Sequence, residues 1–309
     1  MGTHTNLESH SIMSKQVKIW VEAIRLRTLP VSLSGVVMAI GIAAWHNRFK
    51  WIPALLCIVF ALLSQVVSNL ANEYYDYKRG ADKKGRVGPR RGVTEGDIKP
   101  TTLRNVTYIT LATACLVGCG LIPYGGWQMI PVGVLIGVFA LAYSAGPYPL
   151  SYHGFGELTV FLFYGLVPVI FSYYVIAGRM DAMAVLGGIT IGFMGVNVLL
   201  VNNYRDMDDD LEAGKRTAVV IFGRKLASIA YLFNGFMAIA MLSPLWLMIY
   251  LNGSPTVWTY AVPALYLVLH TISWIKLNHR TGSSLNPLLG ETARNMLFFT
   301  LLMLLALVI

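Results

Sequence analysis

Long apolar stretches, separated by short polar segments, make up most of this chain. Nine of them can form a helix of about 20 residues, the length that crosses the hydrocarbon core of a bilayer. They cover residues 21–44, 52–75, 101–123, 127–146, 157–177, 182–203, 226–250, 257–275 and 289–309. Gly and Pro recur inside several stretches, which membrane helices tolerate when neighbouring helices satisfy the freed backbone groups. The pattern predicts an all-α integral membrane protein with nine transmembrane helices.

The composition agrees with this prediction, because 56% of the residues are hydrophobic and only 13% are charged, whereas a soluble domain carries about a quarter charged residues. No linker or low-complexity segment divides the apolar stretches, so we expect residues 18–309 to form a single transmembrane domain. Residues 1–17 are polar and lack the basic-then-apolar order of a signal peptide. We therefore expect them to be a disordered leader.

The net charge of +9 follows from membrane topology. If the N-terminus is cytoplasmic, all of the 24 Lys and Arg residues except Arg48, Lys50 and Arg179 fall on cytoplasmic flanks. Short cytoplasmic loops carry such an excess of basic residues. We expect a multi-pass protein of the cytoplasmic (inner) membrane, with a cytoplasmic N-terminus, the lipid bilayer as its surroundings and no nucleic-acid partner.

Acidic residues gather in two stretches, residues 72–97 and 202–217, which hold ten of the 15 carboxylates. Each begins at the cytoplasmic end of an apolar stretch, the second and the sixth, and this correspondence hints at an internal four-helix repeat. Ionisable groups at a membrane boundary are costly and mark functional sites. We expect the two stretches to face each other across a central cavity that opens toward the cytoplasmic side.

The second acidic stretch has the spacing of a metal site. Asp206 and Asp210 are four residues apart and Asn202 lies four residues earlier, so a continuing helix would place all three on one face. Two carboxylates and an amide suit a hard cation such as Mg²⁺, which completes its shell with water and substrate phosphates.

The first acidic stretch repeats part of this arrangement, with Asn72 and Asp76 four residues apart. Gly80 is expected to end the helix, which would let Asp82 fold back toward the other acids. The two stretches together offer six candidate ligands for such a Mg²⁺ ion, and these are Asn72, Asp76, Asp82, Asn202, Asp206 and Asp210.

Cations accompany both acidic stretches, and they are Lys78, Arg79, Arg90, Arg91, Arg205, Lys215 and Arg216. Carboxylates beside Arg and Lys suit a metal-bridged polyphosphate, because Arg forks hold the oxygens that the metal leaves free. ATP is not expected, since residues 214–217 lack the upstream glycine and the strand of a Walker loop. Asp208, Asp209 and Glu212 are interpreted as solvated neighbours.

A third polar segment, residues 143–157, contains no Lys or Arg, so topology does not explain it. Tyr143, Tyr148 and Tyr152 could line a ligand there, and aromatic faces stabilise a cation such as an allylic one. An aromatic belt at the membrane interface is the alternative. It explains Tyr152 equally well and the other two less well.

These motifs resemble the UbiA superfamily of membrane aromatic prenyltransferases, whose two aspartate motifs match the two acidic stretches. Five segments in order are similar to the 1,4-dihydroxy-2-naphthoate polyprenyltransferases of menaquinone biosynthesis. These segments are Trp20–Pro30, Asn69–Asp76, Gly146–Pro149, Arg205–Asp208 with Gly214–Thr217, and Leu285–Gly290. The resemblance covers about residues 18–309 and implies a nine-helix bundle.

The resemblance also implies roles for individual residues. Asp76 and Asp206 would act in catalysis through Mg²⁺, with Tyr143 and Tyr148 beside the reacting carbon, while Asp82 matches less closely because the family's common spacing is shorter. The implied diphosphate-binding residues are Asn72, Lys78, Arg90, Asn202, Lys215 and Arg216. Arg27 would bind the carboxylate of the acceptor. The basic residue that the family has after Tyr148-Pro is missing here.

The implied reaction transfers a polyprenyl chain from polyprenyl diphosphate to 1,4-dihydroxy-2-naphthoate, with loss of CO₂ and a proton, and gives the demethylmenaquinone skeleton. Another aromatic acceptor, such as 4-hydroxybenzoate or homogentisate, is the nearest alternative. A cation-coupled transporter is a second one, although transporters place their ionisable groups near the membrane midplane. A CDP-alcohol phosphotransferase is disfavoured because its glycine and arginine spacing is absent.

Overall fold

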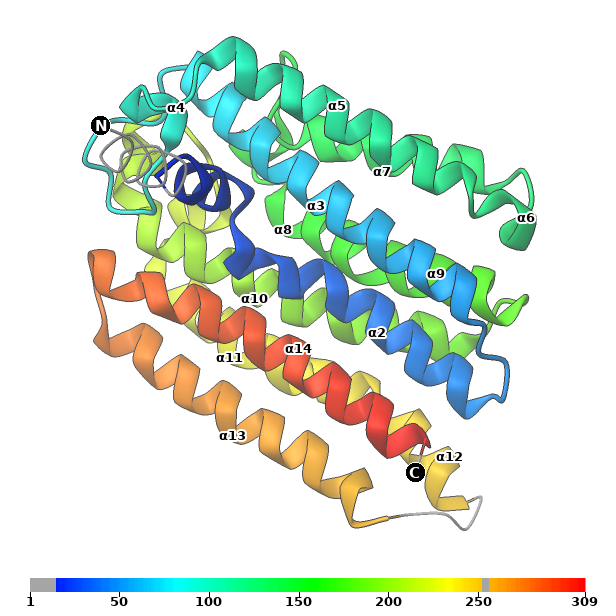
Figure 1. Ribbon diagram of the computed structural model, residues 1–309. Coiled ribbons are helices and arrows are strands. Elements are labelled where there is room, and N and C mark those ends of the chain that lie inside the picture. Colours follow the sequence, from blue (N-terminus) through cyan, green and yellow to red (C-terminus); the bar gives the residue numbers. More distant parts are fainter. Residues whose placement is uncertain (1–14, 252–255, 309) are drawn as a thin grey trace, which may run out of the picture.

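The computed structural model describes residues 15–251 and 256–308, and in these ranges helices are the only regular structure (Figure 1). A helix over residues 15–24 comes first. The elements that follow are η1 (Leu26–Thr28), α2 (Leu29–Trp45), α3 (Trp51–Lys78), α4 (Gly92–Glu95), α5 (Pro100–Cys119), α6 (Ile122–Gly125), α7 (Met129–Ala142), η2 (Leu150–Tyr152), α8 (Gly156–Val160), η3 (Phe161–Leu166), α9 (Val167–Ala177), α10 (Ala182–Glu212), α11 (Ala218–Met241), α12 (Ser243–Leu251), α13 (Val257–His279), η4 (Gly282–Leu285) and α14 (Asn286–Val308). The predicted all-α class is confirmed.

Seven helical segments in the described ranges are long and apolar enough to cross a membrane. The protein is therefore a multi-pass membrane protein. The other two predicted spans correspond to α5 and α7. Helix α5 begins with polar residues and is not among the seven, and α7 is apolar but shorter.

The first predicted span, residues 21–44, is wrong in one respect, because the helix breaks near its start. Arg25 adopts a left-handed backbone conformation with φ of 58°, and the turn η1 separates residues 15–24 from α2. This conformation costs a non-glycine residue about 1–2 kcal/mol. Of the predicted leader, residues 1–14 lie outside the described ranges and residues 15–17 belong to the first helix.

Both acidic stretches follow the helix geometry expected from the sequence. Helix α3 ends at Lys78, and Gly80 has the positive φ of 71° that a chain reversal requires. Helix α10 continues to Glu212, so the three predicted ligands on it do share one helix. The Asp181 side chain caps the other end of α10 by accepting a hydrogen bond from the Met183 backbone N–H at 2.9 Å.

Helix packing brings the ends of α3 and α10 to the same end of the bundle, near α4 (Figure 1). Helix α10 packs against α11 and α14, α2 packs against α14 and α9, and α3 packs against α5. Tyr173, Tyr231 and Phe299 are among the largest fully buried side chains of this core. The polar segment of residues 143–157 lies at this end as well, since Tyr152 donates a hydrogen bond to Asp76.

Helix α10 also makes a close backbone contact with the π-helical turn η3. A β-carbon at Gly165 would lie 2.4 Å from Gly192 Cα and 2.6 Å from the Gly188 carbonyl oxygen. Pro168 is the second residue after the π-helical turn and has no N–H group to donate. Local π-helical adjustments satisfy backbone groups that a proline leaves free. Small residues are therefore required where these two helices meet.

Gly165→Ala should destabilise the protein by about 1–3 kcal/mol, because the added methyl group can be accommodated only by moving backbone. Thermal unfolding in detergent micelles measures the effect. Gly133→Ala on α7 is the matched control, since a β-carbon there would meet no atom within 4 Å. Equal unfolding temperatures for the two variants would contradict the assigned packing.

Candidate active site

A cavity lined by charged and amide side chains, the polar cavity, opens where α3 and α10 end. Its charged and amide lining residues are Arg25, Gln65, Asn69, Asn72, Asp76, Arg86, Arg91, Glu157, Asn202, Asn203, Asp206, Asp210 and Lys215. The two acidic stretches thus meet in one place, as their positions in the sequence predicted.

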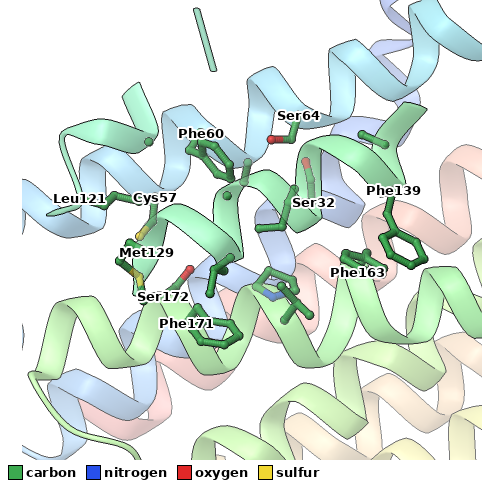
Figure 2. A pocket seen from close by; sticks show the side chains of 18 of the residues that line it. Ser32, Cys57, Phe60, Ser64, Leu121, Met129, Phe139, Phe163, Phe171 and Ser172 are labelled. Atoms are coloured by element: carbon green, nitrogen blue, oxygen red, sulfur yellow. The ribbon is translucent and has the colours of Figure 1, made fainter. Parts of the chain in front are cut away.

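A second cavity, the apolar cavity, shares part of its lining with the first one, and Figure 2 shows it from close by. The figure labels Ser32, Cys57, Phe60, Ser64, Leu121, Met129, Phe139, Phe163, Phe171 and Ser172 among its lining residues. Gln65, Ser68, Tyr143 and Tyr164 line both cavities. These four residues are the junction between a polar compartment and an apolar one.

Lys215 joins the two acidic stretches within the polar cavity. Its Nζ lies 3.2 Å from Asp76 Oδ2 and 3.5 Å from Asp210 Oδ1. Burial lowers the pKa of Lys215, but the surrounding carboxylates outweigh it and raise the pKa above its ordinary value. Lys215 is therefore a fixed positive charge between α3 and α10.

Arg86 makes a second bridge between the stretches. Its Nη1 lies 2.7 Å from Asp82 Oδ1, and its Nη2 lies 3.1 Å from Asp206 Oδ2. Asp82 is buried and has folded back as expected, although it does not line the polar cavity itself. Its burial raises the pKa of the Asp82 carboxyl, while Arg86 opposes that shift. Arg86 did not stand out in the sequence, where it is one of several bases in a polar loop.

The predicted Mg²⁺ ligands form no preassembled cage. Across the described ranges, no three Asp, Glu, His or Cys side chains lie close enough together to hold a metal ion. Mg²⁺ needs only one or two carboxylates, with water and phosphate oxygens as its other ligands. Asp76, Asp206 and Asp210 provide such oxygens from two facing helices. The buried Asp82 Oδ2 is a further oxygen that accepts no hydrogen bond, although Arg91 Nε is 3.2 Å away. The donor set therefore fits a hydrated Mg²⁺.

Arg25, rather than the predicted Arg27, enters the polar cavity. Its Nη2 donates a hydrogen bond of 2.6 Å to Asn72 Oδ1, and its Nε is buried without a partner. Within the part of the chain that the structure describes, it forms no ion pair, whereas the other cations of the polar cavity each pair with a carboxylate. Arg27 is exposed. The left-handed backbone at Arg25 and the turn η1 separate the two arginines from one regular helix.

Of the four cations predicted to bind diphosphate, one lines the polar cavity and three are on the surface. Lys215 lines the polar cavity, but Lys78, Arg90 and Arg216 are exposed and do not. Arg90 pairs instead with Asp97 and lies 3.7 Å from Glu22. The cations that actually line the cavity are Arg25, Arg86, Arg91 and Lys215.

The three candidate tyrosines also separate. Tyr143 lies at the junction of the cavities. Tyr148 is 57% exposed, stacks on His153 and lines neither cavity, so its role beside the reacting carbon stays a prediction. Tyr152 donates a hydrogen bond of 2.9 Å to Asp76 Oδ1, and Lys215 Nζ lies 4.9 Å from its ring centroid.

Of the acids interpreted as solvated, Asp208 and Glu212 fulfil the prediction. Both are exposed and pair with surface bases, Arg224 and Lys83. Asp209 differs, since it is half-buried and its Oδ2 has no hydrogen-bond partner.

The model of the UbiA prenyltransferase family matches residues 32–302. The chain belongs to this family. It is 33% identical over 289 residues to the 1,4-dihydroxy-2-naphthoate octaprenyltransferase of Mycobacterium tuberculosis, a match that covers 91% of this chain and 94% of the relative. The enzyme of the same name from Escherichia coli is 33% identical over 214 residues, which are 67% of this chain and 70% of the relative.

A solved UbiA homologue from Archaeoglobus fulgidus, bound to DMAPP and Mg²⁺, shares the fold of this UbiA family member with a TM-score of 0.65. The likeness covers 93% of this chain and 99% of the homologue at 14% sequence identity. The helical bundle is thus the UbiA fold.

Because Arg25 has no carboxylate partner among the described residues, an added aromatic carboxylate is expected to pair with it. Arg25→Met should then weaken the binding of an aromatic carboxylate by about 10- to 100-fold, since a hydrogen bond to a charged group contributes about 1.5–3 kcal/mol. The dissociation constant of 1-hydroxy-2-naphthoate, followed by its fluorescence, measures this. Arg27→Met is the matched control, and equal losses in both variants would contradict the pairing of the carboxylate with Arg25.

Proposed function

We propose that this protein transfers a polyprenyl chain from polyprenyl diphosphate to 1,4-dihydroxy-2-naphthoate, with loss of CO₂, and so forms demethylmenaquinol for menaquinone biosynthesis. One observation carries the proposal: a cavity with aspartates from two facing helices continues into an apolar cavity. A prenyl diphosphate has the same division into an anionic head and an apolar tail. The names of the relatives from M. tuberculosis and E. coli support the naphthoate acceptor.

The aspartates of both helices would hold the diphosphate through Mg²⁺, which supplies positive charge where the leaving group becomes more negative. The fit of the carboxylate and amide oxygens supports this role for Asn72, Asp76, Asn202, Asp206 and Asp210. Asp82, buried beside Arg86, is a further candidate ligand. The Mg²⁺-bound structure of the Archaeoglobus fulgidus homologue supports the choice of metal.

The cations of the polar cavity would bind diphosphate oxygens directly. Arg86, Arg91 and Lys215 line the cavity and are already paired with carboxylates. Their charges are therefore fixed in position before the substrate arrives, which is the arrangement that stabilises developing negative charge with the least reorganisation.

The apolar cavity would hold the prenyl tail and exclude water from the allylic carbon, which would otherwise be hydrolysed. The allylic carbon then lies at the junction, beside Tyr143. The aromatic face of Tyr143 stabilises positive charge that develops there.

Arg25 would bind the carboxylate of the acceptor. It is the cation of the polar cavity that has no carboxylate partner among the described residues, so a substrate carboxylate can pair with it without breaking an ion pair. 4-Hydroxybenzoate and homogentisate also carry a carboxylate, and they are the alternative acceptors. A cation-coupled transporter is disfavoured, because the acids gather at one end of the bundle and are paired with bases.

In the membrane, we propose that residues 18–309 form one domain with nine transmembrane helices, the seven long segments together with α5 and α7. The distribution of Lys and Arg supports an N-terminus on the cytoplasmic side of the inner membrane. The polar cavity then opens to the cytoplasm, where soluble aromatic acids are available.

Purified protein in lipid nanodiscs, given geranylgeranyl diphosphate, Mg²⁺ and each aromatic acid in turn, should prenylate 1,4-dihydroxy-2-naphthoate, and EDTA should stop the reaction. Chromatography with mass detection measures the product. Prenylation of 4-hydroxybenzoate or homogentisate alone would replace the proposed acceptor. No prenylated product with any acid would refute the proposed activity.

Asp76→Ala and Asp206→Ala should each lower kcat by about 100-fold or more, since they remove oxygens placed for charge stabilisation in the polar cavity. Asp208→Ala is the matched control on the same helix as Asp206, because Asp208 is 79% exposed at its side chain. Wild-type rates in the first two variants would eliminate the metal model.

The orientation can be tested with single cysteines in a variant that lacks the three native ones. With a cytoplasmic N-terminus, the cysteine of Arg48→Cys should react with a membrane-impermeant maleimide added to intact spheroplasts. The cysteine of Lys84→Cys should react only after the membrane is permeabilised. The reverse pattern would invert the topology.

A further inference from the structure

Glu157 is a carboxylate of the polar cavity that the metal and diphosphate roles leave unused. It belongs to α8, in the segment that lacks Lys and Arg. The other carboxylates that line the cavity each lie within ion-pair distance of a Lys or Arg. Glu157 has no such cation among the residues that the structure describes.

The Glu157 side chain is nevertheless held in place. Asn203 on α10 donates a hydrogen bond of 3.0 Å to Glu157 Oε1. In the described ranges, no other side chain donates to this carboxylate, so Oε2 retains its capacity to accept a hydrogen bond. An oriented carboxylate without a counter-ion is a strong hydrogen-bond and proton acceptor.

Glu157 lies near the junction of the two cavities. A β-carbon on the preceding residue, Gly156, would lie 3.5 Å from the hydroxyl oxygen of Tyr143, which lines both cavities. Glu157 is therefore close to the place where the diphosphate head meets the apolar tail. An aromatic ring that attacks the allylic carbon has to lie there as well.

We propose that Glu157, oriented by Asn203, accepts the proton of the acceptor's ring hydroxyl group during attack on the allylic carbon. The inference rests on the proposed function and names the group that activates its acceptor. Arg25 and Glu157 are the two charged groups of the polar cavity without an ion-pair partner among the described residues. An acceptor that carries both a carboxylate and a hydroxyl group complements this pair.

The proposed step is balanced in atoms and electrons. The O–H proton moves to Glu157, the oxygen becomes a carbonyl, and the ring carbon forms a bond with the allylic carbon. The C–O bond to the diphosphate breaks, and its electron pair leaves with the diphosphate. When the ring regains aromaticity by losing the substituent at the attacked carbon, the same proton returns from Glu157 to the oxygen.

Glu157→Gln tests this role, because the amide oxygen can still accept the hydrogen bond from Asn203 but cannot take a proton. With 1,4-dihydroxy-2-naphthoate, kcat should fall by about 100-fold or more, the range typical of a lost general base. The KM for geranylgeranyl diphosphate and the thermal unfolding temperature should stay at their wild-type values. Glu291→Gln is the matched control, since Glu291 pairs with Lys276 and lines neither cavity.

A ring-fluorinated 1,4-dihydroxy-2-naphthoate separates proton acceptance from a purely electrostatic effect. Its hydroxyl group is more acidic, so the ratio of wild-type to Glu157→Gln rates should be several-fold smaller than with the parent acid. An unchanged ratio, or full activity of Glu157→Gln with the parent acid, would overturn the inference. If the wild-type protein prenylates no hydroxylated aromatic acid, the proposed function itself fails, which is a different result.

Discussion

The structure depends on neutralising the carboxylates that are buried where α3 and α10 end. An isolated ionised carboxylate in such a place is strongly destabilising, and a buried pair is tolerated only with good geometry and additional hydrogen bonds. Lys215 and Arg86 meet this need with two side chains, because each contacts acids from both stretches. The charge pairs that make burial tolerable therefore also fix how far apart the two helices lie.

The same constraint gives the cavity its chemistry. Most of its acids and bases are paired with each other, so the positive and negative positions are set before a substrate enters. Preorganised charges of this kind require little reorganisation during a reaction. Arg25 and Glu157 are the exceptions, and an unpaired charge that the fold retains in a cavity is best explained by a substrate group that pairs with it.

The proposed reaction requires the junction of the two cavities. A polar compartment alone would bind a diphosphate, and an apolar compartment alone would bind a lipid tail. Their meeting at Gln65, Ser68, Tyr143 and Tyr164 defines a boundary at which a bond between head and tail can break away from bulk water. The close packing of Gly165 on α10 holds one wall of this region, since it brings the turn that carries Tyr164 against the helix that carries the second set of aspartates.

The sequence by itself determined the helical membrane class, the two acidic stretches and the meeting of those stretches. Hydrophobic length and helical spacing are local properties, so the spacing of Asn202, Asp206 and Asp210 was enough to assign them to one helix face. The end of α3 just before Gly80 was predictable for the same reason, because glycine is the residue type that favours the required backbone conformation.

Only the tertiary structure decided which charges enter the cavity. Arg25 and Arg27 are the same amino acid two positions apart, so the sequence does not distinguish them. In the structure, Arg25, which has a left-handed backbone, lines the polar cavity and Arg27 does not. Arg86 and Arg91 line the cavity while Arg90 pairs with Asp97 on the surface, although the three lie within one loop. The structure also places Glu157 in the cavity, without an ion-pair partner among the described residues. Loop conformation and the pairing of residues far apart in the chain depend on the whole packing arrangement, which no local spacing encodes.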